Sequence, residues 1–144
     1  MDRPQGFPQV RQVVLDATNA RQLAEFYRQL LGYAYRAGDE PPPADQPDPK
    51  GEDWLVIRDA QSGARIAFQR VDSLPSSTWP NAAVPQQLHL DLTVGSTEAL
   101  EVQLQRALAL GARVLQDRSD DPLEPLYVFA DPAGHPFCIF VAPD

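Results

Sequence analysis

The chain has 144 residues, with 12 basic against 20 acidic side chains and a net charge of -8. The acidic excess argues against nucleic acid or an anionic membrane surface as a partner, and the single cysteine, Cys138, excludes an internal disulfide framework. No apolar run approaches the ~20 residues that span a bilayer. Residues 1–5 contain no apolar signal-peptide core, so we expect a cytoplasmic protein.

The first half of the chain alternates between strand and helix patterns. Residues 10–17 alternate as a strand, and Thr18 or Asn19 then caps a helix that ends at Gly32. Short strands are predicted at 33–36, 54–58 and 65–71.

Two segments lack any periodic pattern. Five prolines fall between Pro41 and Pro49, so residues 39–53 are predicted to form an extended loop. This loop is either a lid over a binding site or a solvated insertion. Residues 72–85 resemble a linker, in which Trp79 is the one large apolar anchor.

The second half repeats the order of the first. A strand at 88–94 precedes a helix that Ser96 caps and Gly111 ends, and strands follow at 114–118, 126–130 and 137–141. A shift of 77 positions places Gln12 on His89 and Leu23 on Leu100. Each half is therefore β-α-β-β-β. Neither half can bury both faces of its sheet alone, so we expect them to pack as one unit. The alternative, a single ferredoxin-like domain, explains poorly why the two halves match at a shift of 77 positions.

Four motifs give the sequence a family resemblance. They are Leu23–Gly32 (LAEFYRQLLG), Leu88–Leu92 (LHLDL), Leu110–Ala112 and Asp131–Phe137 (DPAGHPF). In this order they resemble the vicinal oxygen chelate superfamily, which contains glyoxalases, bleomycin-resistance proteins and extradiol dioxygenases, and within it the glyoxalase-like subfamily.

The resemblance implies an α+β fold with two tandem βαβββ modules. Their curled mixed sheets would form a cup with the helices outside. We expect one domain over 1–144, with module 1 at about 9–72, a linker at 73–86 and module 2 at about 87–142. Because members of the family commonly pair, we also expect a homodimer.

The resemblance also implies four metal-ligand positions, two in each module. Here they hold Gln12, Ala67 (or Gln69, on the same strand face), His89 and Cys138. A catalytic divalent site needs about three protein ligands, and only His89 is a strong one. We therefore expect no metal and no other cofactor. A divalent metal, if present, would be bound by Gln12 and His89, with Asp16 or Asp91 nearby.

His89 and Asp91 are the candidate catalytic residues. They share a strand face about 6–7 Å apart along the strand, where a carboxylate can orient an imidazole for acid-base chemistry. Structural hydrogen bonding explains the pair equally well. For Cys138, an inert buried thiol is favoured over a nucleophile, and His135 is expected to be structural.

The candidate ligand-binding residues are polar or aromatic side chains that could line the cup. They are Gln12, Asp16, Trp54, Gln69, Trp79, Thr93, Tyr127 and Phe129. The sequence favours a protein that binds a small molecule in the cup without the usual metal site. The alternative is a lyase, isomerase or dioxygenase-type enzyme that uses His89 and Asp91 or an atypical divalent metal.

Overall fold

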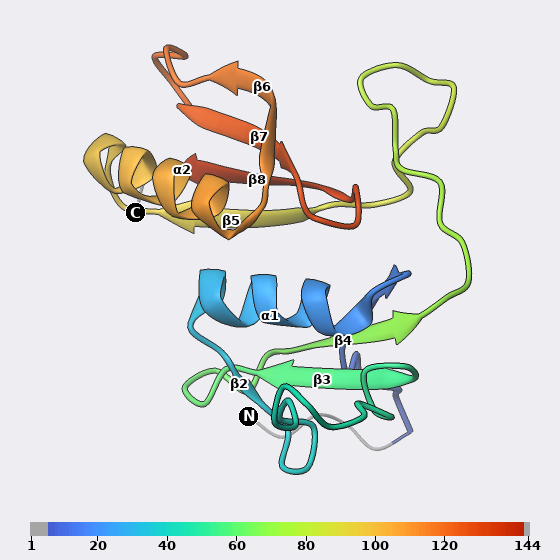
Figure 1. The fold of residues 1–144 in the computed structure, drawn as a ribbon. Coiled ribbons are helices and arrows are strands. Elements are labelled where there is room, and N and C mark those ends of the chain that lie inside the picture. Colours follow the sequence, from blue (N-terminus) through green and yellow to red (C-terminus); the bar gives the residue numbers. More distant parts are fainter. Residues whose placement is uncertain (1–5, 143–144) are drawn as a thin grey trace.

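The chain folds into two successive βαβββ modules, which a computed structural model describes over residues 6–142 (Figure 1). Residues 1–5, from which we expected a cytoplasmic protein without a signal peptide, lie outside the described residues, as do 143–144. Module 1 contains β1 (Val13–Ala17), α1 (Ala20–Leu31), β2 (Ala34–Tyr35), β3 (Trp54–Arg58) and β4 (Arg65–Arg70). Module 2 contains β5 (Leu90–Val94), α2 (Thr97–Leu110), β6 (Arg113–Arg118), β7 (Leu126–Ala130) and β8 (Pro136–Val141).

Each module forms a mixed four-stranded sheet, and the two sheets have the same topology. Their strand orders are β1-β4-β3-β2 and β5-β8-β7-β6. The first pair in each sheet is parallel and the others are antiparallel. The predicted α+β class with two βαβββ modules is therefore confirmed. The 77-position shift carries β1 onto β5 and the first residue of α1 onto that of α2.

Both helices begin and end at the residues that capping chemistry favours. The side chains of Asn19 and Ser96 accept hydrogen bonds from backbone N–H groups in the first turn of α1 and α2. Gly32 and Gly111 end the helices in the left-handed region, with φ of 71° and 113°. Within the described residues, neither helix is long and apolar enough to cross a membrane.

One continuous core joins the two modules. α1 packs on β3 and β4 and also contacts α2. The ring of Tyr27 on α1 lies 6.0 Å from Phe68 of its own sheet and 5.9 Å from Phe137 of the other sheet. Because aromatic rings bury a large apolar area, these contacts stabilise the junction between the modules. This agrees with the expectation that the modules pack as one unit.

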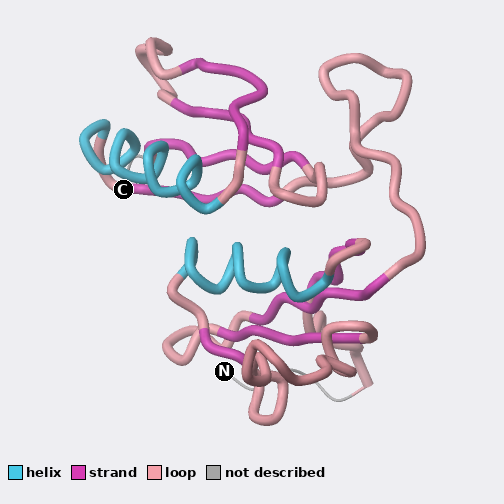
Figure 2. The backbone as a smooth tube through the Cα atoms, in the orientation of Figure 1, coloured by secondary structure: helices cyan, strands magenta, loops and turns pink. Residues whose placement is uncertain are grey.

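The connection between the modules is long and irregular. From the end of β4 to the start of β5 the chain forms neither helix nor strand, and Figure 2 shows it as one extended loop on one side of the molecule. Thr78 and Val84 close a turn within it through reciprocal hydrogen bonds. The linker therefore has some local structure of its own.

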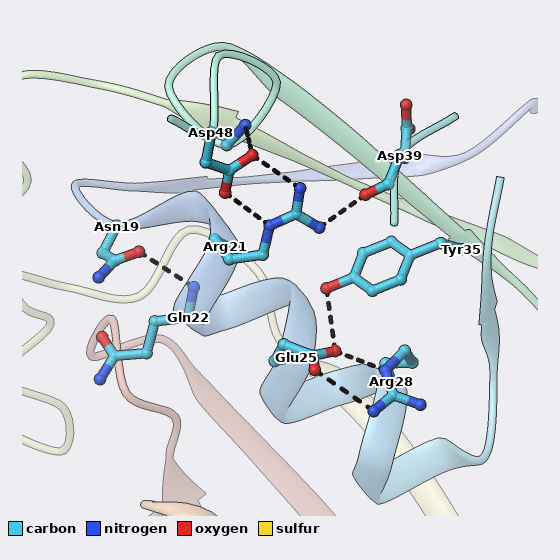
Figure 3. Close-up of polar contacts among 9 residues, drawn as sticks. Asn19, Arg21, Gln22, Glu25, Arg28, Tyr35, Asp39 and Asp48 are labelled. Atoms are coloured by element: carbon cyan, nitrogen blue, oxygen red, sulfur yellow. Dashed lines mark hydrogen bonds and ion pairs between the residues drawn. The ribbon is translucent and has the colours of Figure 1, made fainter. Parts of the chain in front are cut away.

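The proline-rich loop between β2 and β3 is anchored to α1 (Figure 3). The Arg21 guanidinium forms a bidentate ion pair with Asp48, at 2.8 and 2.9 Å, and donates to the Asp39 carbonyl oxygen. This pair holds the pKa of Asp48 below its usual range. The loop is thus fixed at both ends of its proline run.

The carboxylate of Asp39 is completely buried within this loop region. It accepts hydrogen bonds from the backbone N–H of Val56 at 3.0 Å and from Arg36, and it pairs with Lys50 at 3.3 Å. The Asp39 carboxylate therefore pairs the Val56 N–H of β3, which β2 is too short to reach. The same contact links the loop to the sheet.

We expect Asp39→Ala to lower the free energy of unfolding by about 2–4 kcal/mol, because it removes two charge-assisted hydrogen bonds and leaves a buried N–H unpaired. Urea unfolding measures the loss. Asp45→Ala is the matched control, because Asp45 lies in the same loop and is exposed. Equal stability of the two variants would contradict this account.

Candidate functional site

A cavity of about 450 Å³ opens where the two modules meet the linker. Module 1 contributes β1, Tyr27 of α1 and Gln69 of β4, and module 2 contributes the start of β5 and the turn between β7 and β8. The linker supplies the remaining wall, from Leu74 to Leu88. We call it the inter-module cavity. No residue of the proline-rich loop is among the described residues that line it.

Three of the predicted site residues lie together in this cavity. Asp16 and Gln69 are register partners in the parallel pair β1–β4, so their side chains stand next to each other. His89 comes from module 2, one residue before β5. The cavity thus brings a carboxylate, a carboxamide and an imidazole from both halves of the chain to one space.

The β7–β8 turn at the edge of the cavity is organised by the buried side chain of Asp131. The Asp131 carboxylate is 3% exposed and accepts hydrogen bonds from the Tyr27 hydroxyl at 2.7 Å and from the backbone N–H groups of Ala133 and His135. His135 in turn contacts the Asp16 carbonyl oxygen through Nε2 at 2.6 Å, which places a proton on that nitrogen. This network connects module 2 to α1 and β1 of module 1.

Gly134 lets the linker approach this turn closely. Its φ is 92°, and a Cβ built there would lie 2.4 Å from the Ser76 hydroxyl oxygen and 3.2 Å from the Ser76 Cα. A larger residue would be strained and would push the linker outward. The family-like motif DPAGHPF therefore shapes the cavity.

A second group of polar side chains lies beside the cavity on module 2. His89 Nε2 is 3.1 Å from Asp91 Oδ1, and the Cys138 thiol donates to the same oxygen at 2.7 Å. Asp91 and Cys138 are register partners in the parallel pair β5–β8. We call these three residues the His-Asp-Cys cluster. Burial, followed by the contact with Asp91, raises the pKa of the Cys138 thiol to about 12.

The other predicted site residues lie away from the inter-module cavity. Tyr127 and Phe129 of β7 belong to the core, where Phe129 stacks on Phe137 and the Tyr127 hydroxyl donates to Glu101. Thr93 is exposed on β5. Trp54, Trp79 and Gln12 are partly buried elsewhere, and the Gln12 Oε1 atom is buried without a hydrogen-bond partner in the described part of the chain.

Sequence reasoning missed the linker side chains and the residues around Asp131. Leu74, Val84 and Gln86 line the cavity, although an irregular segment carries no periodic signal that would indicate which side chains point inward. The DPAGHPF motif did give a signal for the Asp131 turn, because an aspartate before Pro-x-Gly commonly accepts hydrogen bonds from its own turn.

Comparison with known proteins agrees with this architecture. Residues 12–140 match the family described as "Glyoxalase-like domain". The fold and the paired modules thus define a protein of the glyoxalase, bleomycin-resistance and dioxygenase superfamily. Within it, the chain belongs to the glyoxalase-like domain family. Comparison with proteins of curated function finds no match.

Solved structures with the same fold are distant in sequence. A glyoxalase/bleomycin resistance protein/dioxygenase family enzyme from Burkholderia phytofirmans is 16% identical, with a TM-score of 0.68 over 92% of this chain and 98% of its own. A glyoxalase/dioxygenase from Nostoc punctiforme is 17% identical, with a TM-score of 0.65 over 100% and 97%. A mutant of the fosfomycin resistance protein FosX from Listeria monocytogenes, complexed with Mn(II) and a dihydroxypropylphosphonic acid, is 16% identical, with a TM-score of 0.66 over 95% and 94%. These likenesses concern the fold.

The four metal positions implied by the family resemblance do not form a ligand set in this chain. Ala67 offers no donor atom and is fully buried. Gln12 is not among the residues that line the cavity with His89. Within residues 6–142, the one convergent group of three His, Cys, Asp or Glu side chains is the His-Asp-Cys cluster, which belongs to module 2 alone.

The Asp131 network predicts a pH-dependent stability. Burial raises the pKa of Asp131 above its ordinary value of 3.8, although the Tyr27 hydroxyl opposes this. A carboxyl with a raised pKa contributes stability that is complete below pH 3.8 and is lost as the pH rises through the folded-state pKa. We therefore expect the unfolding free energy of the native chain, relative to that of Asp131→Asn, to fall as the pH rises from 3.8 through the folded-state pKa of Asp131.

Urea unfolding at a series of pH values measures this difference. The exposed Asp120→Asn is the control, for which the difference from the native chain should stay constant with pH. Parallel stability curves for the native chain and Asp131→Asn would refute the assignment.

Proposed function

We propose that this chain binds a small organic molecule in the inter-module cavity, without the four-position metal centre that the family resemblance implies. The observation that carries the proposal is the cavity itself, because its volume of about 450 Å³ is walled by both modules and by the linker. Cavities that bind drug-sized ligands have volumes of about 300–1,000 Å³ and combine apolar walls with a few polar groups.

The lining supports a neutral or cationic ligand. Apolar side chains such as Val14, Leu74 and Leu88 form much of the wall, and Asp16 supplies a carboxylate. The described lining contains no lysine or arginine, and the net charge of the chain is -8. The overall field therefore favours positive charge and opposes an anion.

An enzymatic role is the second candidate. His89 lies in the cavity wall, and its Nε2 is 3.1 Å from the Asp91 carboxylate, a distance at which the carboxylate orients the imidazole. A lyase or isomerase step would require proton transfer by this pair. Loss of turnover in Asp91→Asn with unchanged ligand affinity would favour the enzyme over the binder.

Blocking the cavity tests the binding proposal. We expect a thermal-shift screen of amine-bearing and neutral aromatic compounds to give ligands that stabilise the native chain. A ligand at 100 times its Kd adds about 2.7 kcal/mol, or several degrees in Tm. Leu88→Trp should weaken this binding at least tenfold, since Leu88 lines the cavity and is 55% exposed.

Val102→Trp on α2 is the matched control, because Val102 is 56% exposed and does not line the cavity. Calorimetric titration with the best compound should give the native Kd for this variant. Equal affinity of both tryptophan variants, or a screen without any stabilising compound, would contradict the proposal.

We further propose that the chain forms a homodimer. Support comes from exposed apolar side chains of module 2 that lie outside the cavity lining, among them Leu108 on α2 and Val114 on β6, which are 41% and 39% exposed. Light scattering coupled to gel filtration should give about twice the chain mass of 15.9 kDa. A mass that remains at 15.9 kDa at micromolar concentration would overturn this proposal.

A further inference from the structure

Two polar side chains of module 1 stand side by side in the wall of the inter-module cavity. Asp16 of β1 and Gln69 of β4 are register partners in a parallel pair, so the sheet fixes the spacing between them. No other described residue forms a hydrogen bond or an ion pair with either side chain. A carboxylate and a carboxamide oxygen are therefore available to a molecule in the cavity.

Other polar groups of the wall already have partners within the protein. His89 Nε2 lies 3.1 Å from the Asp91 carboxylate. His135 Nε2 contacts the backbone carbonyl oxygen of Asp16 at 2.6 Å. The Ser77 hydroxyl donates to a backbone carbonyl oxygen of the linker. These side chains therefore have less hydrogen-bonding capacity left for a ligand than the Asp16 carboxylate has.

The linker adds a further acceptor to the wall. Gln86 lines the cavity, and its Oε1 atom is buried without a hydrogen-bond partner in the described part of the chain. A buried oxygen without a donor is costly. Rotation of the terminal carboxamide of Gln86 would bring this oxygen to a donor inside the cavity. A ligand that carries an N–H group would therefore remove the cost.

These acceptors favour a ligand that combines a positive charge with N–H donors. Asp16 is the one charged acid among the described lining residues, and none of them is a lysine or arginine. A primary ammonium carries one positive charge and three N–H donors. These match one carboxylate and the two carboxamide oxygens of Gln69 and Gln86. The apolar wall around Leu74 and Leu88 suits the hydrocarbon part of such a ligand.

The lining also distinguishes a primary ammonium from a quaternary one. Quaternary ammonium ions have no N–H donor and are bound in cages of aromatic rings. Tyr27 is the one residue with a benzene or indole ring among the described residues that line the cavity. It is only 1% exposed, and its hydroxyl donates to Asp131. The cavity therefore offers hydrogen-bond acceptors to a cation but no aromatic cage.

We propose that Asp16, Gln69 and Gln86 bind the primary ammonium group of a small organic amine, whose apolar part occupies the rest of the inter-module cavity. This inference rests on the proposed function, because it names the class of ligand that the same cavity takes.

Three series of matched compounds test the recognition of N–H donors. The ω-phenylalkylamines with one to four methylene groups are compared with their trimethylammonium and alcohol counterparts, by calorimetric titration of the full chain at pH 7. We expect at least one amine to bind. Its trimethylammonium counterpart has the same charge without N–H donors, and its alcohol has no charge, so each should bind at least tenfold more weakly.

Variants assign the ammonium to its acceptors. Asp16→Asn should weaken amine binding at least tenfold and leave alcohol binding nearly unchanged, because it removes the charge alone. Gln69→Met and Gln86→Met should each weaken amine binding severalfold. Gln86→Met should also raise the Tm of the ligand-free chain by about 2–4 °C, because it replaces an unpaired buried oxygen by an apolar group. Gln46→Met is the matched control, since Gln46 is exposed in the proline-rich loop and does not line the cavity.

Equal or tighter binding of the trimethylammonium compounds would overturn the inference, as would native amine affinity in Asp16→Asn or in Gln86→Met. Binding of the alcohols alone would also overturn it, while the proposed binding of small molecules in the cavity would stand. If no compound of the three series binds, the inference fails, and the wider screen with Leu88→Trp decides separately whether the cavity binds other ligands.

Discussion

The buried carboxylate of Asp131 is the constraint on which the arrangement of the two modules depends. It lies in module 2, yet it accepts a hydrogen bond from Tyr27 of module 1 and also fixes the turn that carries His135. A buried carboxyl is costly unless it is fully hydrogen-bonded. The turn, α1 and β1 must therefore meet in one geometry, and all three contribute to the wall of the inter-module cavity.

Most of the fold was predictable from the sequence because its signals are local. Asn19 or Thr18 before an apolar helical pattern, and Gly32 after it, fix the bounds of α1 within a residue. Short runs of apolar and aromatic residues bounded by turn residues gave β3 and β7 with their observed limits. The shift between the halves predicted the duplicated topology, since equal spacing of strand and helix leaves few ways to fold.

The candidate site was only partly predictable, because it depends on which strand faces meet. Alternation placed Asp16 and His89 on polar faces, and both line the cavity. The same reasoning does not tell which face of β7 meets the helices, and register pairing places Phe129 opposite Phe137 in the core. The contact between Asp91 and Cys138 joins residues 47 positions apart, so no local pattern indicates it.

The irregular linker has a consequence for how this chain can assemble. It is the only covalent connection between two units that otherwise meet through side chains such as Tyr27 and Phe137. The same side-chain contacts can form between module 1 of one copy and module 2 of another, with the linkers crossing over. Exchange of whole modules would then conserve the core and those parts of the cavity wall that the two modules supply, while changing which chain supplies each half.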